Sequence, residues 1–362
     1  MISYNGWERD YQKNKEKYIE IFDKAMSQDS EDISFLEKKI ADISNRKYAV
    51  GVNNATDALY FSLVSHGIKE GDEVLVTDFS FISSSSCISM VGAIPVFCEV
   101  DMETYHMSLD SIKRMYTDKT KAIIYTHLFG NMSDTTEILD FCKENNIVFI
   151  EDAAQSLGSS LHDIKAGSIG DCSSFSFNSN KVIAGISGGG VFLCDDEDKS
   201  NIVKKLRNHG GNSSNFEMLG RNSRLSLLNA EIINFRLDNR EKYQTKRQEI
   251  AKEYDEVFED LPLQIQAVKQ GLNHNYHKYT IRFEDTDTRK RVRDKLKDSG
   301  IKTSIHYEKA LSENSMYKHK GHKKDNCKNS IKISQTIMSL PIHPWLTNQE
   351  ISKISNMIGM LV

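Results

Sequence analysis

The chain has 362 residues, with 47 Lys and Arg against 51 Asp and Glu, a net charge of −4, and 39% hydrophobic residues. These values are typical of a globular protein of two domains at roughly 150 residues each, and they exclude collagen-like and disordered chains. Because the net charge is slightly negative, no overall positive field attracts nucleic acid, and we predict no nucleic-acid partner.

The N-terminal residues lack the apolar core that follows the basic start of a signal peptide. No stretch approaches the run of about 18 apolar residues that a membrane helix needs. The six cysteines are scattered and form no C-x-x-C pair, which favours reduced core thiols over a disulfide framework. We therefore expect a cytoplasmic protein with no membrane partner.

Two amphipathic helices are predicted first, within residues 8–46, and a strand at 48–52 and a helix at 56–66 follow. Apolar strands then alternate with helices. The predicted strands are 73–76, 94–97, 122–125 and 147–150, and the predicted helices are 83–91, 109–116 and 135–145. Continuous apolar strands separated by helices predict a mostly parallel sheet that helices cover on both faces.

A different pattern begins near residue 173, where two strands at 173–177 and 190–193 flank a connection rich in Gly, Ser and Asn. One long charged helix over about 230–260 is expected to bridge to a second domain. In that domain we expect elements at 279–283, 289–299 and 302–307, and a terminal helix from 348. The predicted division is therefore a large domain over residues 1–240 and a smaller α+β domain over 241–362.

Three polar segments each follow a predicted strand, and open α/β sheets bind ligands at the carboxyl ends of their strands. The segment 53–59 opens a helix, where free N–H groups can bind an anion, although an ordinary N-cap is the alternative. Asp152 follows the strand 147–150, where a carboxylate either pairs with a cation or caps a helix. Lys181 lies between an aromatic strand and the glycines 188–190, although most loop lysines are solvated.

Together these segments supply an anion site, a buried acid and a lysine, the parts that pyridoxal 5'-phosphate chemistry requires. They resemble the sugar-nucleotide aminotransferases of the DegT/StrS type over about residues 30–355. The resemblance implies the aspartate-aminotransferase-like fold type I. It depends on ordered segments at 54–59, 80–81, 152–155, 176–181, 206–210, 220–225, 305–307 and 339–344.

The resemblance implies roles for the residues around the cofactor ring. Lys181 would bind pyridoxal 5'-phosphate covalently through its amine and act as the catalytic base. Asp152 would pair with the ring nitrogen, Gln155 would contact the ring hydroxyl, and Phe81 would stack on the ring.

The resemblance also implies how the phosphate is bound. Ala55, Thr56 and Ser176 would bind it within one chain, and Asn222 of the partner subunit would reach it in a homodimer with shared active sites. Ala55 replaces the usual glycine of this motif, which is tolerable where its backbone φ is negative.

The resemblance implies L-glutamate as amino donor and a nucleotide-linked keto sugar as acceptor, in amino-sugar or polysaccharide biosynthesis. The segment 222–225 resembles that of relatives that act on 3-keto sugars. We therefore expect a dTDP-3-keto-6-deoxyhexose, with a 4-keto sugar as the alternative. His306 and Tyr307 are candidates to contact the sugar, or to serve a structural role. Ser187 is a third candidate, and it replaces the acidic residue usual at its position.

Two other functions remain to be weighed against the amino transfer. Dehydratases of the same family carry histidine where this chain has Lys181, and a non-catalytic regulator would lack the lysine or the acid. His319, His322 and Cys327 are too irregularly spaced for a metal site, so we predict no metal. The five lysines between Tyr317 and Lys328 suit a solvated loop or, alternatively, a contact with the sugar-nucleotide pyrophosphate.

Overall fold

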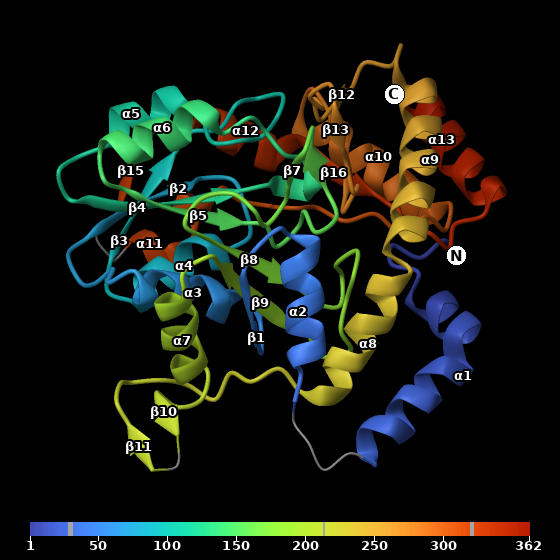
Figure 1. The fold of residues 1–362 in the computed structure, drawn as a ribbon. Coiled ribbons are helices and arrows are strands. Elements are labelled where there is room, and N and C mark those ends of the chain that lie inside the picture. The colour runs from blue at the N-terminus through green and yellow to red at the C-terminus, as the bar shows by residue number, and fades with distance from the viewer. Residues whose placement is uncertain (28–31, 213, 319–321) are drawn as a thin grey trace.

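A central sheet organises the computed structural model, which describes residues 1–27, 32–212, 214–318 and 322–362 (Figure 1). In these residues the sheet has eight strands in the order β1-β9-β8-β5-β4-β2-β3-β15. Strand β9 is antiparallel to both of its neighbours, and the other neighbouring pairs are parallel. The strands are β1 (Tyr48–Val52), β2 (Glu73–Thr77), β3 (Ile94–Cys98), β4 (Thr120–Thr126), β5 (Val148–Asp152), β8 (Cys172–Ser176), β9 (Gly190–Cys194) and β15 (Lys323–Lys324).

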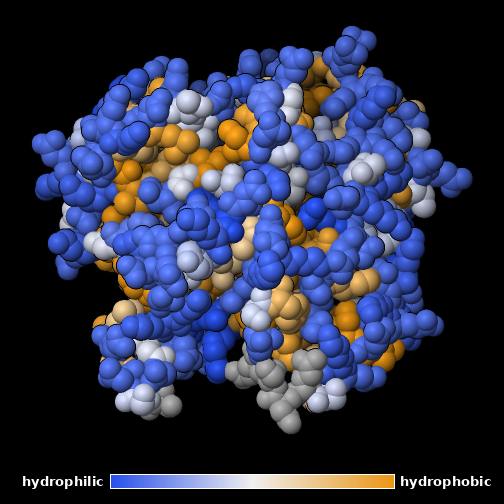
Figure 2. Space-filling model, viewed as in Figure 1, coloured by the Kyte–Doolittle hydropathy of each residue, from blue (hydrophilic) through white to orange (hydrophobic). Residues whose placement is uncertain are grey.

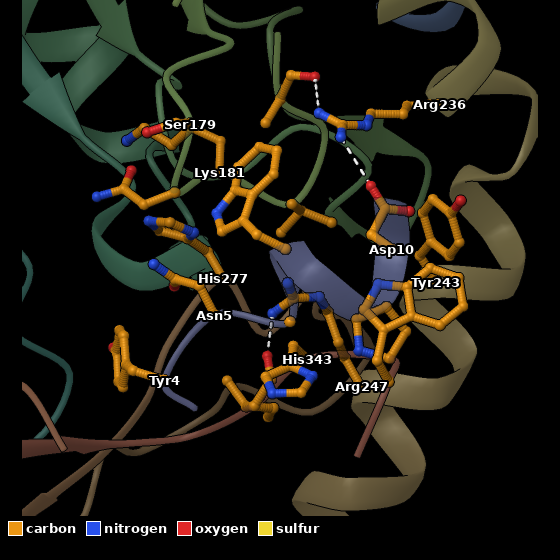
Figure 3. A pocket seen from close by; sticks show the side chains of 18 of the residues that line it. Tyr4, Asn5, Asp10, Ser179, Lys181, Arg236, Tyr243, Arg247, His277 and His343 are labelled. Carbon is orange, nitrogen blue, oxygen red and sulfur yellow. Dashed lines mark hydrogen bonds and ion pairs between the residues drawn. The ribbon is translucent and has the colours of Figure 1, made fainter. Parts of the chain in front are cut away.

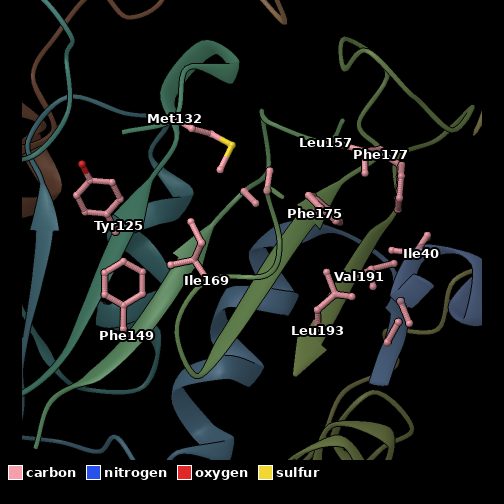
Figure 4. Close-up of a cluster of buried hydrophobic side chains, with 14 of the residues drawn as sticks. Ile40, Tyr125, Met132, Phe149, Leu157, Ile169, Phe175, Phe177, Val191 and Leu193 are labelled. Carbon is pink, nitrogen blue, oxygen red and sulfur yellow. The ribbon is translucent and has the colours of Figure 1, made fainter. Parts of the chain in front are cut away.

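Helices cover both faces of this sheet, as the sequence predicts (Figure 1). Successive strand residues alternate between two cores, so that Leu75 lies in one and Val74 and Val76 lie in the other. Figure 4 shows part of the first core, where Phe149, Phe175 and other side chains of the sheet lie close together. The helices of these layers are α2 (Ser34–Ile43), α3 (Ala55–Ser65), α4 (Ser83–Met90), α5 (Leu109–Met115), α6 (Thr136–Glu144), α7 (Glu197–Leu206) and α8 (Leu227–Asp238).

A third core lies in the C-terminal part of the chain, around an antiparallel sheet of order β12-β14-β16. Ile2 joins this core, so the N-terminus packs against the C-terminal part. The predicted division after residue 240 falls at the start of α9. The elements here are α9 (Arg240–Phe258), β12 (Gln264–Ile265), β14 (Tyr279–Arg282), α10 (Thr286–Asp298), α12 (Lys328–Thr336), β16 (Ile337–Leu340) and α13 (Asn348–Leu361).

The remaining elements are short, except for α1 at the N-terminus. Strand β15 belongs to the C-terminal part in sequence, yet it pairs with β3 at the edge of the large sheet. The hairpin of β10 and β11 projects from the body of the molecule (Figure 1). These elements are α1 (Trp7–Met26), η1 (Leu128–Gly130), β6 (Ser160–Leu161), β7 (Ile164–Lys165), β10 (Gly211–Asn212), β11 (Asn215–Phe216), β13 (Leu272–Asn273), η2 (Leu311–Glu313) and α11 (Ser315–Lys318).

Two predicted elements differ in the structure. The single helix predicted over 230–260 is wrong, because the chain breaks at Asn239 between α8 and α9. The Asn239 side chain donates a hydrogen bond of 3.0 Å to the Phe235 carbonyl and so ends α8. Residues 302–307 form no helix or strand, and only Ser304 makes an isolated bridge, to Ser339.

The cysteines are free and buried, in agreement with the prediction of reduced core thiols. Among the helices that the structure describes, none combines the length and apolar character needed to cross a membrane.

Candidate active site

A cavity of about 620 Å³ lies at the carboxyl ends of β5 and β8, where the sequence predicts a ligand. It brings together nearly all of the predicted site residues, which come from α3, the sheet and the C-terminal part. The predicted residues that line it are Ala55, Thr56, Phe81, Asp152, Gln155, Ser176, Lys181, Ser187, His306 and Tyr307. Asn222 does not line the cavity of its own chain.

The N-terminus of α3 forms one wall of this cavity. Asn54 caps the helix, since its side-chain oxygen accepts a hydrogen bond of 2.8 Å from the Asp57 N–H. The N–H groups of Ala55 and Thr56 precede any intrahelical acceptor and carry the positive end of the helix dipole. Ala55 is helical with a negative φ, so its methyl group introduces no backbone strain. The wall therefore fits the phosphate of the predicted cofactor.

Asp152 ends strand β5 with its carboxylate turned into the cavity, and it is only 4% exposed. The hydroxyl of Ser84 donates to it over 2.7 Å and that of Thr126 over 3.3 Å. Glu151, the preceding residue, turns to the opposite side and accepts two main-chain hydrogen bonds of 2.7 and 2.8 Å. Of the two adjacent acids, one thus binds main-chain N–H groups and the other presents a fixed carboxylate to the cavity.

Lys181 lies in the connection between β8 and β9, where its side chain reaches the same cavity. Burial lowers the pKa of its amine to about 8, and the nearby charge of Asp152 offsets part of this effect. Gly188 and Gly189 have φ values of +110° and +128°, which other residues rarely adopt. These glycines let the connection fold back into β9 beside the lysine.

The other wall is aromatic and polar. Phe81 is 51% exposed, and its ring centroid lies 6.0 Å from that of Tyr307. Gln155 accepts a hydrogen bond of 3.0 Å from the Phe129 N–H and donates one of 3.3 Å to the Tyr307 hydroxyl. An aromatic face that is open to the cavity suits a planar heterocycle.

The predicted substrate residues line the cavity as well. His306 hydrogen-bonds through Nδ1 to the Ser339 hydroxyl at 2.9 Å, and burial lowers its pKa to about 3. The Ser187 hydroxyl accepts a hydrogen bond of 3.1 Å from the Asn229 side chain and remains exposed. Whether either side chain contacts the sugar stays a prediction.

Sequence reasoning missed several residues of the cavity: Ser83, Ser84, His277 and Lys278. Ser83 and Ser84 belong to the serine run at the start of α4, a composition that could have indicated hydroxyl donors. Lys278 directly precedes the apolar strand β14, and no sequence signal separates it from a solvated lysine at a strand end.

The described part of the lysine-rich segment 317–328 lies elsewhere. No described residue from 317 to 328 lines the cavity. Lys323 forms an ion pair of 2.6 Å with Glu73 at the sheet edge, so this part is a paired strand and not a loop. His319 lies outside the described residues, while the His322 ring packs 5.8 Å from Phe97 and Cys327 is buried.

The comparisons with known proteins agree with this geometry. The model of the DegT/DnrJ/EryC1/StrS aminotransferase family matches residues 10–359. The chain is 32% identical over 324 residues to the UDP-N-acetyl-3-dehydro-alpha-D-glucosamine 3-aminotransferase of Acidithiobacillus ferrooxidans, covering 89% of this chain and 86% of that protein. It is 31% identical over 331 residues to the dTDP-3-amino-3,6-dideoxy-alpha-D-galactopyranose transaminase of Aneurinibacillus thermoaerophilus, covering 89% and 88%.

The fold agrees with a solved structure as well. The crystal structure of S. venezuelae DesV in complex with a ketimine intermediate superimposes with a TM-score of 0.95, covering 99% of this chain and 98% of that chain at 24% identity. The chain belongs to the DegT/DnrJ/EryC1/StrS aminotransferase family. It is a pyridoxal-phosphate-dependent aminotransferase of fold type I, as the sequence predicts.

Proposed function

We propose that this aminotransferase moves an amino group from L-glutamate to a nucleotide-linked keto sugar in amino-sugar biosynthesis. One observation carries the proposal: Lys181 and Asp152 line the same cavity, beside the free N–H groups at the start of α3. Each part of pyridoxal phosphate that needs a protein partner finds one there.

When bound, the cofactor withdraws electrons from the carbon that carries the transferred amine. Asp152 stabilises the positive charge of the ring nitrogen, and the first N–H groups of α3 with Ser176 bind the phosphate. Lys181 moves the proton between the amino-acid carbon and the cofactor carbon, which requires a neutral amine. Its lowered pKa supplies that neutral form near physiological pH.

We further propose a homodimer in which Asn222 contributes to the cavity of the neighbouring subunit. Asn222 is exposed and lies outside its own cavity. Close to it in the chain, Phe216 is 60% and Leu219 97% exposed beside the projecting β10–β11 hairpin. Hydrophobic residues also form patches on the mostly hydrophilic face that Figure 2 shows. Exposed apolar side chains on a projecting segment favour burial against a second chain.

For the sugar, we propose amination at C3 of a 6-deoxyhexose on dTDP. Two relatives support C3, since both names place the amino or oxo group at that carbon, and one of them names a dTDP-linked 6-deoxy sugar. Incubation with dTDP-linked 3-keto and 4-keto sugars, with the product identified by NMR, tests this proposal. Amination of the 4-keto sugar alone would contradict it.

The purified protein should show visible absorbance that L-glutamate bleaches. The Lys181→Ala variant should not turn over glutamate, whereas Lys302→Ala, which removes an exposed lysine that does not line the cavity, should behave as the unmodified protein. A Lys181→Ala protein that still turned over glutamate would refute the role of Lys181 as the base.

A further inference from the structure

Lys278 is a buried amine in the wall of the active-site cavity. It directly precedes β14, it is 5% exposed, and it lines the cavity described above. Its ammonium nitrogen lies 4.9 Å from the centre of the Tyr4 ring. Lys278 and Lys181 also border a second, smaller hollow of about 70 Å³, around which Figure 3 shows Tyr4, Lys181, His277 and Arg247.

The carboxylates that line these two hollows already have hydrogen-bond or ion-pair partners other than Lys278. Among the described residues that line either hollow, the acids are Asp152 and Asp10. Asp10 pairs with Arg236 over 2.7 Å (Figure 3) and also accepts a hydrogen bond of 2.7 Å from Tyr18. Asp152 accepts hydrogen bonds from two hydroxyls. Within the described part of the chain, the ammonium of Lys278 forms neither a hydrogen bond nor an ion pair.

Lys278 also borders a third hollow, whose acid is Asp255, and Asp255 accepts a hydrogen bond of 2.7 Å from the Tyr279 hydroxyl. The charges that act on the pKa of Lys278 are positive. Burial, Lys181 and Arg247 all lower its pKa well below the ordinary value. Arg247 is itself held by the main-chain carbonyls of Tyr276, at 3.0 Å, and Ile342, so it is fixed structurally. A buried ammonium among other cations is costly unless an anion pairs with it.

We propose that Lys278 binds a carboxylate of the substrate. This inference rests on the proposed function, because that function supplies the two carboxylate sources: the amino donor, or a uronic acid group on the nucleotide sugar. The cofactor phosphate is a poorer match, since its donors belong to α3 and β8. The side chains beside Lys278, Tyr4 and His306, come instead from the N-terminal and C-terminal segments.

The first experiment measures the donor. Stopped-flow bleaching of the holoenzyme by L-glutamate gives the dissociation constant and the maximal rate for the unmodified protein, for Lys278→Met and for the control Lys302→Met. Methionine keeps the length and removes the charge. If the donor carboxylate is bound, Lys278→Met should weaken glutamate binding at least tenfold and the control should change it less than twofold.

The second experiment measures the sugar. The reverse half-reaction is followed with two amino-sugar nucleotides that differ only in carrying a carboxylate or a hydroxymethyl group at C6. If the sugar carboxylate is bound, the unmodified enzyme should prefer the acid at least tenfold and Lys278→Met should lose the preference. Binding by Lys278→Met within twofold of the unmodified enzyme in both experiments would overturn the proposal.

A third measurement separates this inference from the proposed function. Glutarate has the two carboxylates of the donor but no amine, so calorimetry reports its binding without turnover. Because a bound carboxylate raises the pKa of Lys278, binding should take up a proton, and Lys278→Met should lose both the uptake and the affinity. Equal glutarate binding by both proteins would exclude the donor carboxylate and leave the sugar carboxylate of the second experiment as the ligand of Lys278. A lower melting temperature of Lys278→Met with unchanged affinities for glutarate, glutamate and both amino-sugar nucleotides would overturn the proposal. Absorbance that no amino acid alters would instead refute the proposed function, while glutarate binding still reports whether Lys278 binds a dicarboxylate.

Discussion

The amine of Lys181 should titrate far below an ordinary lysine. Burial lowers its pKa from 10.5 to about 8, and the charge of Asp152 opposes that change. At pH 7 about 9% of an amine with a pKa of 8 is neutral, against about 0.03% at a pKa of 10.5, so the reactive form should be roughly 300-fold more abundant. In Asp152→Asn the pKa should fall further, because the neutral amide no longer attracts the ammonium.

Competitive labelling of the apoenzyme with an amine reagent measures this titration, with the exposed Lys302 as internal reference. Peptide mass spectrometry gives the labelling rate of each lysine as a function of pH. Accessibility cancels when the rate at pH 7 is divided by the rate at high pH, and this ratio should be about one tenth for Lys181. A labelling rate for Lys181 that still rises tenfold per pH unit above about pH 9, as the rate of an ordinary lysine does, would refute the reasoning.

Three further predictions concern the framework of the site. Asn54→Ala should lower the free energy of unfolding by about 1 kcal/mol in urea titrations, because the Asp57 N–H loses its acceptor. Asn54→Ser should retain most of the stability, and an equal loss in both variants would contradict the capping role. Burial raises the pKa of Asp78 to about 7, so its contribution to stability is present at low pH and is lost as the pH rises through 7. The melting temperature of Asp78→Asn, measured relative to that of the unmodified protein, should therefore rise between pH 5 and 8. A difference in melting temperature that stays constant over this range would contradict the prediction. Arg46→Met should cost about 3–5 kcal/mol in urea, because buried Arg46 donates to three main-chain carbonyls and an aspartate; a loss below about 1 kcal/mol would contradict this.

The sequence predicted the central sheet and most of the cavity because both depend on local patterns. Asp152 follows a run of apolar residues that only a buried strand explains, and the carboxyl ends of parallel strands converge. The helix opening at Ala55 and the glycines beside Lys181 carry equally local signals. Local patterns therefore suffice to predict that these residues share one site.

The missed features depend on contacts between distant segments. Asn239 ends a helix inside a run of charged residues whose periodicity continues across the break. Strand β15 consists of two lysines, and it pairs with β3 because Glu73 lies within 2.6 Å of Lys323. Lys278 is buried by Tyr4, more than 270 residues away in the chain, and no local pattern can report that contact.

The charge of the whole chain has the wrong sign for its ligands. A net charge of −4 repels both an anionic cofactor and an anionic sugar nucleotide. Attraction must therefore come from groups inside the cavity, where burial strengthens each interaction. The N-terminus of α3 provides one such group, and Lys181 and Lys278 provide two more. Under the proposed function Lys181 would be joined to the cofactor through its amine, which leaves Lys278 as the amine beside it whose protonated form can distinguish a carboxylate from a neutral group.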